Sequence, residues 1–356
     1  MSDTRTVVGQ KNFNQWPIEN STRLPAISGV VLAVLLYPFV LTQFHRAVGS
    51  GAEIPTGYEV ISGVFWLAAA FACPALCLLC AIRLAAGQIV TTTARRALRL
   101  AYFGVTAPTA YTFLGVVLYM SGSPISDKWV WSAAWLLLAA WTAAAPKGVI
   151  LPQHRASRMP DGLRIAHAVA ATIISVYVLF HIVNHLLGLL GPEAHTAMMK
   201  LGRGVYRARL VQPFLVALFL FQVGSGLALA WRWSGGTAPP FRVFQVASGL
   251  YLSIFILGHM NSVFIFARTY LKIDTGWAFA TGAPTGLIHD SWNIRLLPHY
   301  WLGVFFVLSH LASGLRVVLS AHGLAEMAAA RVWTAGLVVS ALIATGIIAG
   351  MCGIRI

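Results

Sequence analysis

Two histidines, His181 and His259, stand in long apolar stretches of the sequence and could bind a cofactor. His181 lies in AATIISVYVLFHIVNHLLG (170–188), and His259 lies in SGLYLSIFILGHMNSVFIF (248–266). An ionisable side chain inside a membrane span is costly and usually faces the interior of a helix bundle. There it can make an interhelical hydrogen bond or bind a haem iron as a neutral imidazole. The question is therefore which of these roles the two histidines play.

The two histidines occupy equivalent positions in an internal repeat. The segments 163–188 and 241–268 align without gaps, and so do the segments that follow them, LFLFQVGSGLALAWRW and VFFVLSHLASGLRVVL. The aligned pairs are Arg164 with Arg242, Ala171 with Gly249, Ser175 with Ser253, His181 with His259, Gln222 with His310, and Gly226 with Gly314. Equivalent repeat positions lie at equivalent membrane depths. We therefore expect the two imidazoles to face each other at one depth, where they could hold both axial faces of a haem.

Small residues precede each histidine on the same stretch. Gly249 and Ser253 are four positions apart and present a small face. Such a face allows either a flat macrocycle or a neighbouring helix to approach closely. His185 lies four positions beyond His181, and three roles stay open for it: replacing His181 as the ligand, bonding a haem propionate, or facing headgroups.

The elements that carry these residues are membrane spans. Hydrophobic residues make up 58% of the chain and charged residues 10%, against about 25% charge in a soluble domain. Apolar runs of about 20 residues indicate spanning helices. We expect an all-α, polytopic helical membrane protein with about nine spans, near 24–44, 60–84, 100–120, 129–146, 165–190, 210–231, 243–267, 298–320 and 332–351.

The spans are predicted to fall into two groups around a basic, proline-bearing linker. We predict a polar N-terminal segment (1–23), a four-helix bundle without clear redox ligands (24–150), and a linker (151–163). The remainder (164–356) is predicted to be a four-helix bundle of the haem-binding type plus one extra helix. Cys73, Cys77, Cys80 and Cys352 lack the spacing of a zinc site, and we interpret them as packing residues.

The net charge of +15 fits lipid headgroups better than nucleic acid, because the basic residues lie at span ends. More lysine and arginine fall on the side of the N-terminus, which predicts a cytoplasmic or matrix N-terminus. The loop with Lys200, Arg203, Arg207 and Arg209 argues against this orientation. His181 and His259 lie in the span halves on the opposite side.

Residues 160–320 resemble the cytochrome b membrane anchor of succinate dehydrogenase and fumarate reductase. The resemblance rests on Ser248–Gly249 followed by Gly258–His259, and on SHLASGLR (Ser309–Arg316). It implies one haem b between His181 and His259. It also pairs Gln222 with His310, and because glutamine is a poor axial ligand, the second haem is expected to be absent or altered. The alternative to a ligand role for His310 is a purely structural one, a hydrogen bond to Gln222 across the bundle. The family's quinone motif is kept only in part, so quinone is a further cofactor that the resemblance implies weakly.

The resemblance predicts a function in electron transfer. The protein would be a non-catalytic subunit of a respiratory complex in a bacterial or mitochondrial inner membrane, passing electrons between quinol and a partner subunit. The loop 272–297 would cap the haem, with Arg295 placed for propionates or a partner, or it would be an ordinary interfacial aromatic belt. The alternative function is a haem-free anchor or assembly subunit, whose histidines serve as packing hydrogen bonders.

Overall fold

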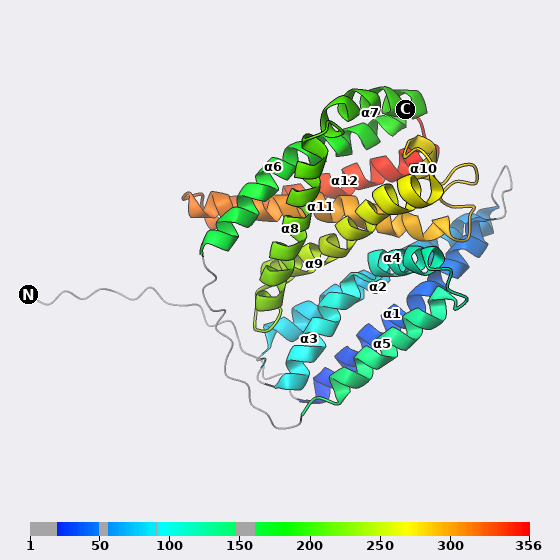
Figure 1. The fold of residues 1–356 in the computed structure, drawn as a ribbon. Helices are drawn as coiled ribbons and strands as arrows, with labels where there is room; N and C mark the ends of the chain where they lie inside the picture. The colour runs from blue at the N-terminus through cyan, green and yellow to red at the C-terminus, as the bar shows by residue number, and fades with distance from the viewer. Residues whose placement is uncertain (1–19, 50–55, 88, 90, 147–160) are drawn as a thin grey trace, which may run out of the picture.

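The computed structural model describes residues 20–49, 56–87, 89, 91–146 and 161–356, and its regular elements are all helical (Figure 1). In chain order they are α1 (Asn20–Val48), α2 (Gly57–Ala86), α3 (Thr92–Val105), α4 (Ala107–Met120), α5 (Asp127–Ala143), α6 (Asp161–Leu186), η1 (Leu187–Leu190), α7 (Pro192–Tyr206), α8 (Val211–Trp233), α9 (Pro240–Met260), η2 (Asn261–Leu271), α10 (Trp277–Thr281), η3 (Asn293–Arg295), α11 (Leu296–Ala321) and α12 (Glu326–Met351). The predicted segments 1–23 and 151–163 lie mostly outside the described residues.

Seven helices in the described ranges are long and apolar enough to cross a membrane. They are Ala26–Val48, Gly57–Ala86, Gly162–Leu190, Val211–Trp233, Pro240–Leu271, Asn293–Ala321 and Glu326–Met351. An eighth span is possible if α3 and α4 are counted together. The prediction of a polytopic helical membrane protein is therefore supported, whereas the count of nine is not confirmed.

The predicted spans 100–120 and 129–146 account for the difference. The first is divided into α3 and α4, which meet at an angle of 70°. Pro108 stands at the start of α4. It has no backbone N–H to donate, and in a continuous helix its ring would clash with the carbonyl four residues earlier. The Thr106 hydroxyl donates to the Phe103 carbonyl at 2.7 Å and so satisfies one acceptor at the break. The second predicted span is α5, which has 17 residues, fewer than the ~20 that a perpendicular crossing needs.

Helix α9 connects the two halves of the molecule. It packs against α8 and α11 on one side and against α2, α3 and α4 on the other. Figure 1 shows α1 to α5 grouped together, with α6 and α7 on the far side of α9. One hydrophobic cluster contains buried residues of both halves, among them Tyr37 of α1, Tyr111 of α4 and Tyr251 of α9. The repeat-bearing helices are therefore supported by the first half through α9.

Helix α6 lies at the periphery and presents an apolar face outward. Its exposed large residues recur every three or four positions: Ile165, Val169, Ile173, Val176, Leu179 and Val183. This spacing places them on one side of the helix. Contact with lipid explains why such a face is apolar, and the opposite side of α6 carries the histidines.

Candidate functional site

Histidine rings from four helices form one cluster near the end of the bundle where α6 finishes. Between ring centroids, His195 lies 5.1 Å from His185, and His185 lies 4.6 Å from His181. His181 in turn lies 5.9 Å from His259. Phe255 then bridges His259 and His299, at 5.8 Å and 4.8 Å. We call the five histidines the histidine cluster; they are His181, His185, His195, His259 and His299.

The pair formed by His181 and His259 joins two helices that are otherwise apart. Helix α8 packs closely against both α6 and α9, whereas α6 and α9 have few close backbone approaches in the described part of the chain. The two imidazoles therefore extend from their helices into the space between them. Their ring planes are inclined by 66°, so they do not stack on each other.

Equivalent aromatic residues orient the two histidines. Tyr177 stacks on His181 with an interplanar angle of 16°, and Phe255 stacks on His259 with an angle of 7°. Each aromatic residue stands four positions before its histidine, which places both on one helix face. Within the same repeat, the Ser175 hydroxyl donates to the Ala171 carbonyl, and the Ser253 hydroxyl donates to the Gly249 carbonyl. The repeat read from the sequence is thus also a repeat of side-chain contacts.

Several polar atoms of the histidine cluster are buried without a partner. Asn184 Nδ2 donates to His195 Nε2 at 3.3 Å, so the remaining proton of a neutral His195 ring is on Nδ1. This nitrogen has no hydrogen-bond partner in the described structure, and the same holds for Nδ1 of His185 and of His299. Buried polar atoms are normally satisfied. The cluster therefore has spare capacity for a polar ligand or water.

The histidine cluster is not arranged as a site for a bare metal ion. Among the residues that the structure describes, no group of three or more His, Cys, Asp or Glu side chains could hold one. The rings follow one another in a chain rather than converging on a point. This leaves pairwise ligation, in which two imidazoles bind an ion whose other ligands belong to a cofactor.

The helix backbone changes just after His259. From Asn261 to Leu271 the chain is a π-helix of 11 residues, although π-helices are rare, mostly single-turn, and frequent at functional sites. The equivalent stretch of the first repeat stays α-helical up to Leu186. The wider winding therefore distinguishes the second copy immediately beyond its histidine.

Known proteins provide no guide to this site. No family model, curated protein or solved structure matches the chain.

A second polar set lies further along the same bundle: on α6, His167 stands 14 residues before His181, roughly 21 Å at 1.5 Å per residue. Gln222 Nε2 donates to His167 Nε2 at 2.9 Å, and His167 Nδ1 donates to the Ser225 hydroxyl at 2.7 Å. Both nitrogens of His167 are thus occupied. The expected hydrogen bond between Gln222 and His310 is not found among the described residues, where Gln222 bonds to His167; the pairing of the two as haem ligands stays a prediction.

His310 instead bonds within its own repeat. Its Nδ1 and the Ser248 hydroxyl lie 2.9 Å apart. A Cβ on Gly249 would lie 3.2 Å from His310 Cε1, so the ring fills the space that the glycine leaves open. The small face at Gly249 and Ser253 therefore receives a neighbouring side chain and lies away from the histidine cluster. Its predicted part in cofactor binding stays a prediction.

Arg295 faces the first half of the molecule. Its guanidinium Nη1 lies 2.6 Å from the Asp127 carboxylate, and its Nε donates to the Trp292 carbonyl. The guanidinium also lies over the Tyr111 ring. The structure therefore places Arg295 against α4 and α5, where it pairs with Asp127, and does not bring it together with His181 and His259.

Two members of the histidine cluster were not among the expected site residues. His195 lies on α7, outside the spans, and is 2% exposed; His299 lies near the start of α11 and is 5% exposed. Burial lowers the pKa of His195 to about 4, and the positive charge of Arg203 contributes less. Neither residue follows the repeat, so no spacing in the sequence signals its contact with the others.

Proposed function

We propose that the protein is a b-type cytochrome-like membrane subunit that carries one haem between His181 and His259. In this proposal α6, α8, α9 and α11 form the haem-binding bundle and α12 is the extra helix. The observation that carries it is the distance of 5.9 Å between the two ring centroids. Two imidazoles bound to opposite faces of one metal, with bonds of about 2 Å, put their ring centroids roughly 6 Å apart.

The surroundings of the pair support the same proposal. Tyr177 stacks on His181 and Phe255 stacks on His259, which limits the rotation of both imidazoles. The scarcity of close backbone approaches between α6 and α9 is compatible with a planar group between these helices. When bound, a haem supplies one-electron redox chemistry, and the protein sets its potential through ligands and burial.

His185 is the competing ligand on α6. Its ring lies 4.6 Å from that of His181, so a small movement could exchange the two. We rank His181 first because it faces His259 directly and holds the repeat position. In this proposal His185 supports the site from one turn further along the helix.

The function follows from the cofactor and the membrane setting. A haem at this depth would pass electrons between a quinol and a partner subunit of a respiratory complex, in an energy-transducing inner membrane. The part of the chain that the structure describes is helical membrane bundle, so the catalytic head of such a complex would be another chain.

A haem-free anchor or assembly subunit is the second candidate. It is favoured by His167, whose two nitrogens are both hydrogen-bonded to protein groups. A histidine bonded in this way holds helices together and has no nitrogen left for a ligand. If the histidine cluster did the same, the fold would serve only to hold partner subunits.

Difference spectroscopy of the purified protein separates the two candidates. We expect sharp b-type bands in the reduced-minus-oxidised spectrum. These bands should be lost in His181→Ala and in His259→Ala, and they should be kept in His310→Ala, which removes a buried histidine outside the histidine cluster. His185→Ala should keep the bands with altered position or intensity. Absence of bands in the wild-type protein expressed with haem supplied would leave the anchor function, and loss only in His310→Ala would refute the ligand pair.

A further inference from the structure

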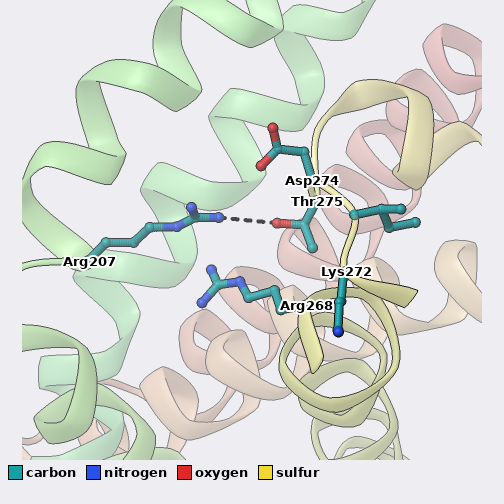
Figure 2. A pocket seen from close by; sticks show the side chains of 6 residues that line it. Arg207, Arg268, Lys272, Asp274 and Thr275 are labelled. Atoms are coloured by element: carbon teal, nitrogen blue, oxygen red, sulfur yellow. Dashed lines mark hydrogen bonds between the residues drawn. The ribbon is translucent and has the colours of Figure 1, made fainter. Parts of the chain in front are cut away.

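A basic cavity lies where the π-helix ends, next to the connection between α7 and α8. Its volume is about 490 Å³. Figure 2 shows Arg207 reaching toward it from one side, with Arg268 and Lys272 on the other. The six lining residues are Arg207, Arg268, Lys272, Ile273, Asp274 and Thr275.

Positive charge exceeds negative charge in this cavity. Three of the lining residues are cationic and one, Asp274, is acidic. A further cation adjoins it, because Arg203 and Arg207 both donate to the Thr275 hydroxyl, at 3.3 Å and 3.1 Å. Like charges held this close repel each other in a medium of reduced dielectric constant. An anion between them would remove that repulsion.

The arginines also keep unused donors. Nε of Arg203 and Nε of Arg207 are buried and have no hydrogen-bond partner in the described structure. Guanidinium groups bind phosphate and carboxylate oxygens through charge-assisted hydrogen bonds, often two at a time. The hydroxyl of Thr275 satisfies one donor on each arginine and leaves the rest for a ligand.

The cavity lies beside the ends of two helices that are long and apolar enough to cross a membrane, α8 and the helix Pro240–Leu271. Arg207 comes four residues before α8 begins at Val211, and Lys272 directly follows the span that ends at Leu271. Large apolar residues in and just after α7 are strongly exposed: Leu201, Val205 and Leu210. A basic pocket beside exposed apolar side chains at a span end matches the two parts of a phospholipid, an anionic head and acyl chains.

We propose that this cavity binds the phosphodiester group of an anionic phospholipid, through Arg207, Arg268 and Lys272. Arg203 supports the site by sharing Thr275 with Arg207. Asp274 lowers the net positive charge of the cavity, which favours a singly charged diester over a dianionic group. This site is independent of any haem between His181 and His259, and either can exist without the other.

The test uses the full-length protein in a neutral detergent. Adding phosphatidylglycerol should raise the Tm by about 2–4 °C, as expected for a ligand that binds the native state, and phosphatidylcholine should not. The rise should be lost in the double variant Arg207→Gln/Arg268→Gln and kept in Arg209→Gln. Arg209 is an exposed cation two residues away and does not line the cavity, so it controls for general surface charge.

A second variant guards against misfolding of the double variant. Lys272 has a left-handed backbone with φ of +57°, a conformation that asparagine tolerates well. Lys272→Asn should therefore fold normally and reduce the number of phosphatidylglycerol molecules retained in native mass spectrometry. Equal retention in wild type and Lys272→Asn, or an equal Tm rise in the double variant, would overturn the proposal. A rise with inorganic phosphate but none with phosphatidylglycerol would reject the lipid and assign a free-phosphate site.

Discussion

A substitution at Gly303 would displace the ring that stacks on His259. It lies on α11 opposite Phe255, and a Cβ added to it would lie 2.3 Å from Cε2 and 2.4 Å from Cζ of that ring. Ordinary contact begins at 3.4 Å, so Gly303→Ala requires the ring to move by about 1.1 Å. Phe255 stacks almost parallel on His259, and its movement would release the imidazole.

The expected cost follows from two opposing effects. Overpacking of this kind costs about 1–3 kcal/mol, while replacing a helical glycine by alanine returns up to about 1 kcal/mol. The net loss for Gly303→Ala is therefore about 0–3 kcal/mol. Gly314→Ala is the matched control on the same helix, because nothing lies within 4 Å of its Cβ position, and it should gain up to about 1 kcal/mol.

Two measurements check this reasoning. Unfolding by SDS in mixed micelles should show Gly303→Ala less stable than Gly314→Ala by about 1–3 kcal/mol. If the haem proposal holds, the difference spectrum of Gly303→Ala should also show weaker or shifted bands, and that of Gly314→Ala should be unchanged. Identical stability and identical spectra for the two variants would show that Phe255 does not hold His259 in place.

Two further predictions concern charge. Asp127→Asn should lower the free energy of unfolding by about 3–5 kcal/mol because it leaves Arg295 buried and unpaired. In a double-mutant cycle, Asp127→Leu/Arg295→Met should cost clearly less than the sum of its single changes. Additive costs in the cycle, or a loss for Asp127→Asn no larger than that of the exposed control Arg331→Gln, would contradict this. His195 has its pKa lowered to about 4 by burial, against about 6.5 when unfolded, so the unfolded state binds more protons between these values. Its effect on stability is absent above about pH 6.5 and becomes increasingly unfavourable as the pH falls to about 4. The Tm of His195→Gln should therefore fall less steeply than that of the wild type across this range, and parallel curves would count against the burial of His195.

The sequence predicted the helical class and most of the spans because apolar length is a local property. The expected span 165–190 corresponds to Gly162–Leu190, and 332–351 falls within Glu326–Met351. The break at Pro108 escaped prediction because the apolar run continues through it. Proline is tolerated within α2, at Pro74, so its presence alone does not mark a break.

Only those residues of the candidate site that occupy equivalent positions in the repeat could be predicted from the sequence. Alignment singled out His181 and His259, and the structure places their rings side by side. His195 and His299 come from elements outside the repeat positions, and their contact depends on how α7 and α11 pack. The resemblance implied the pairing of Gln222 with His310, but a hydrogen bond depends on which side chains lie within reach of each other. In the structure Gln222 bonds to His167 and His310 bonds to Ser248.

The π-helix after His259 begins where the two copies of the repeat stop resembling each other. Up to the histidine, the two copies of the repeat make the same contacts: an aromatic ring four residues earlier and a serine bonded to its own turn. Beyond it, the first copy continues as an α-helix to Leu186 and contributes His185 to the histidine cluster, whereas the second forms a π-helix that contains Arg268 and is followed by Lys272. The two copies therefore differ most just beyond their histidines: the first contributes imidazoles to the histidine cluster, and the second contributes basic side chains to the cavity next to α7.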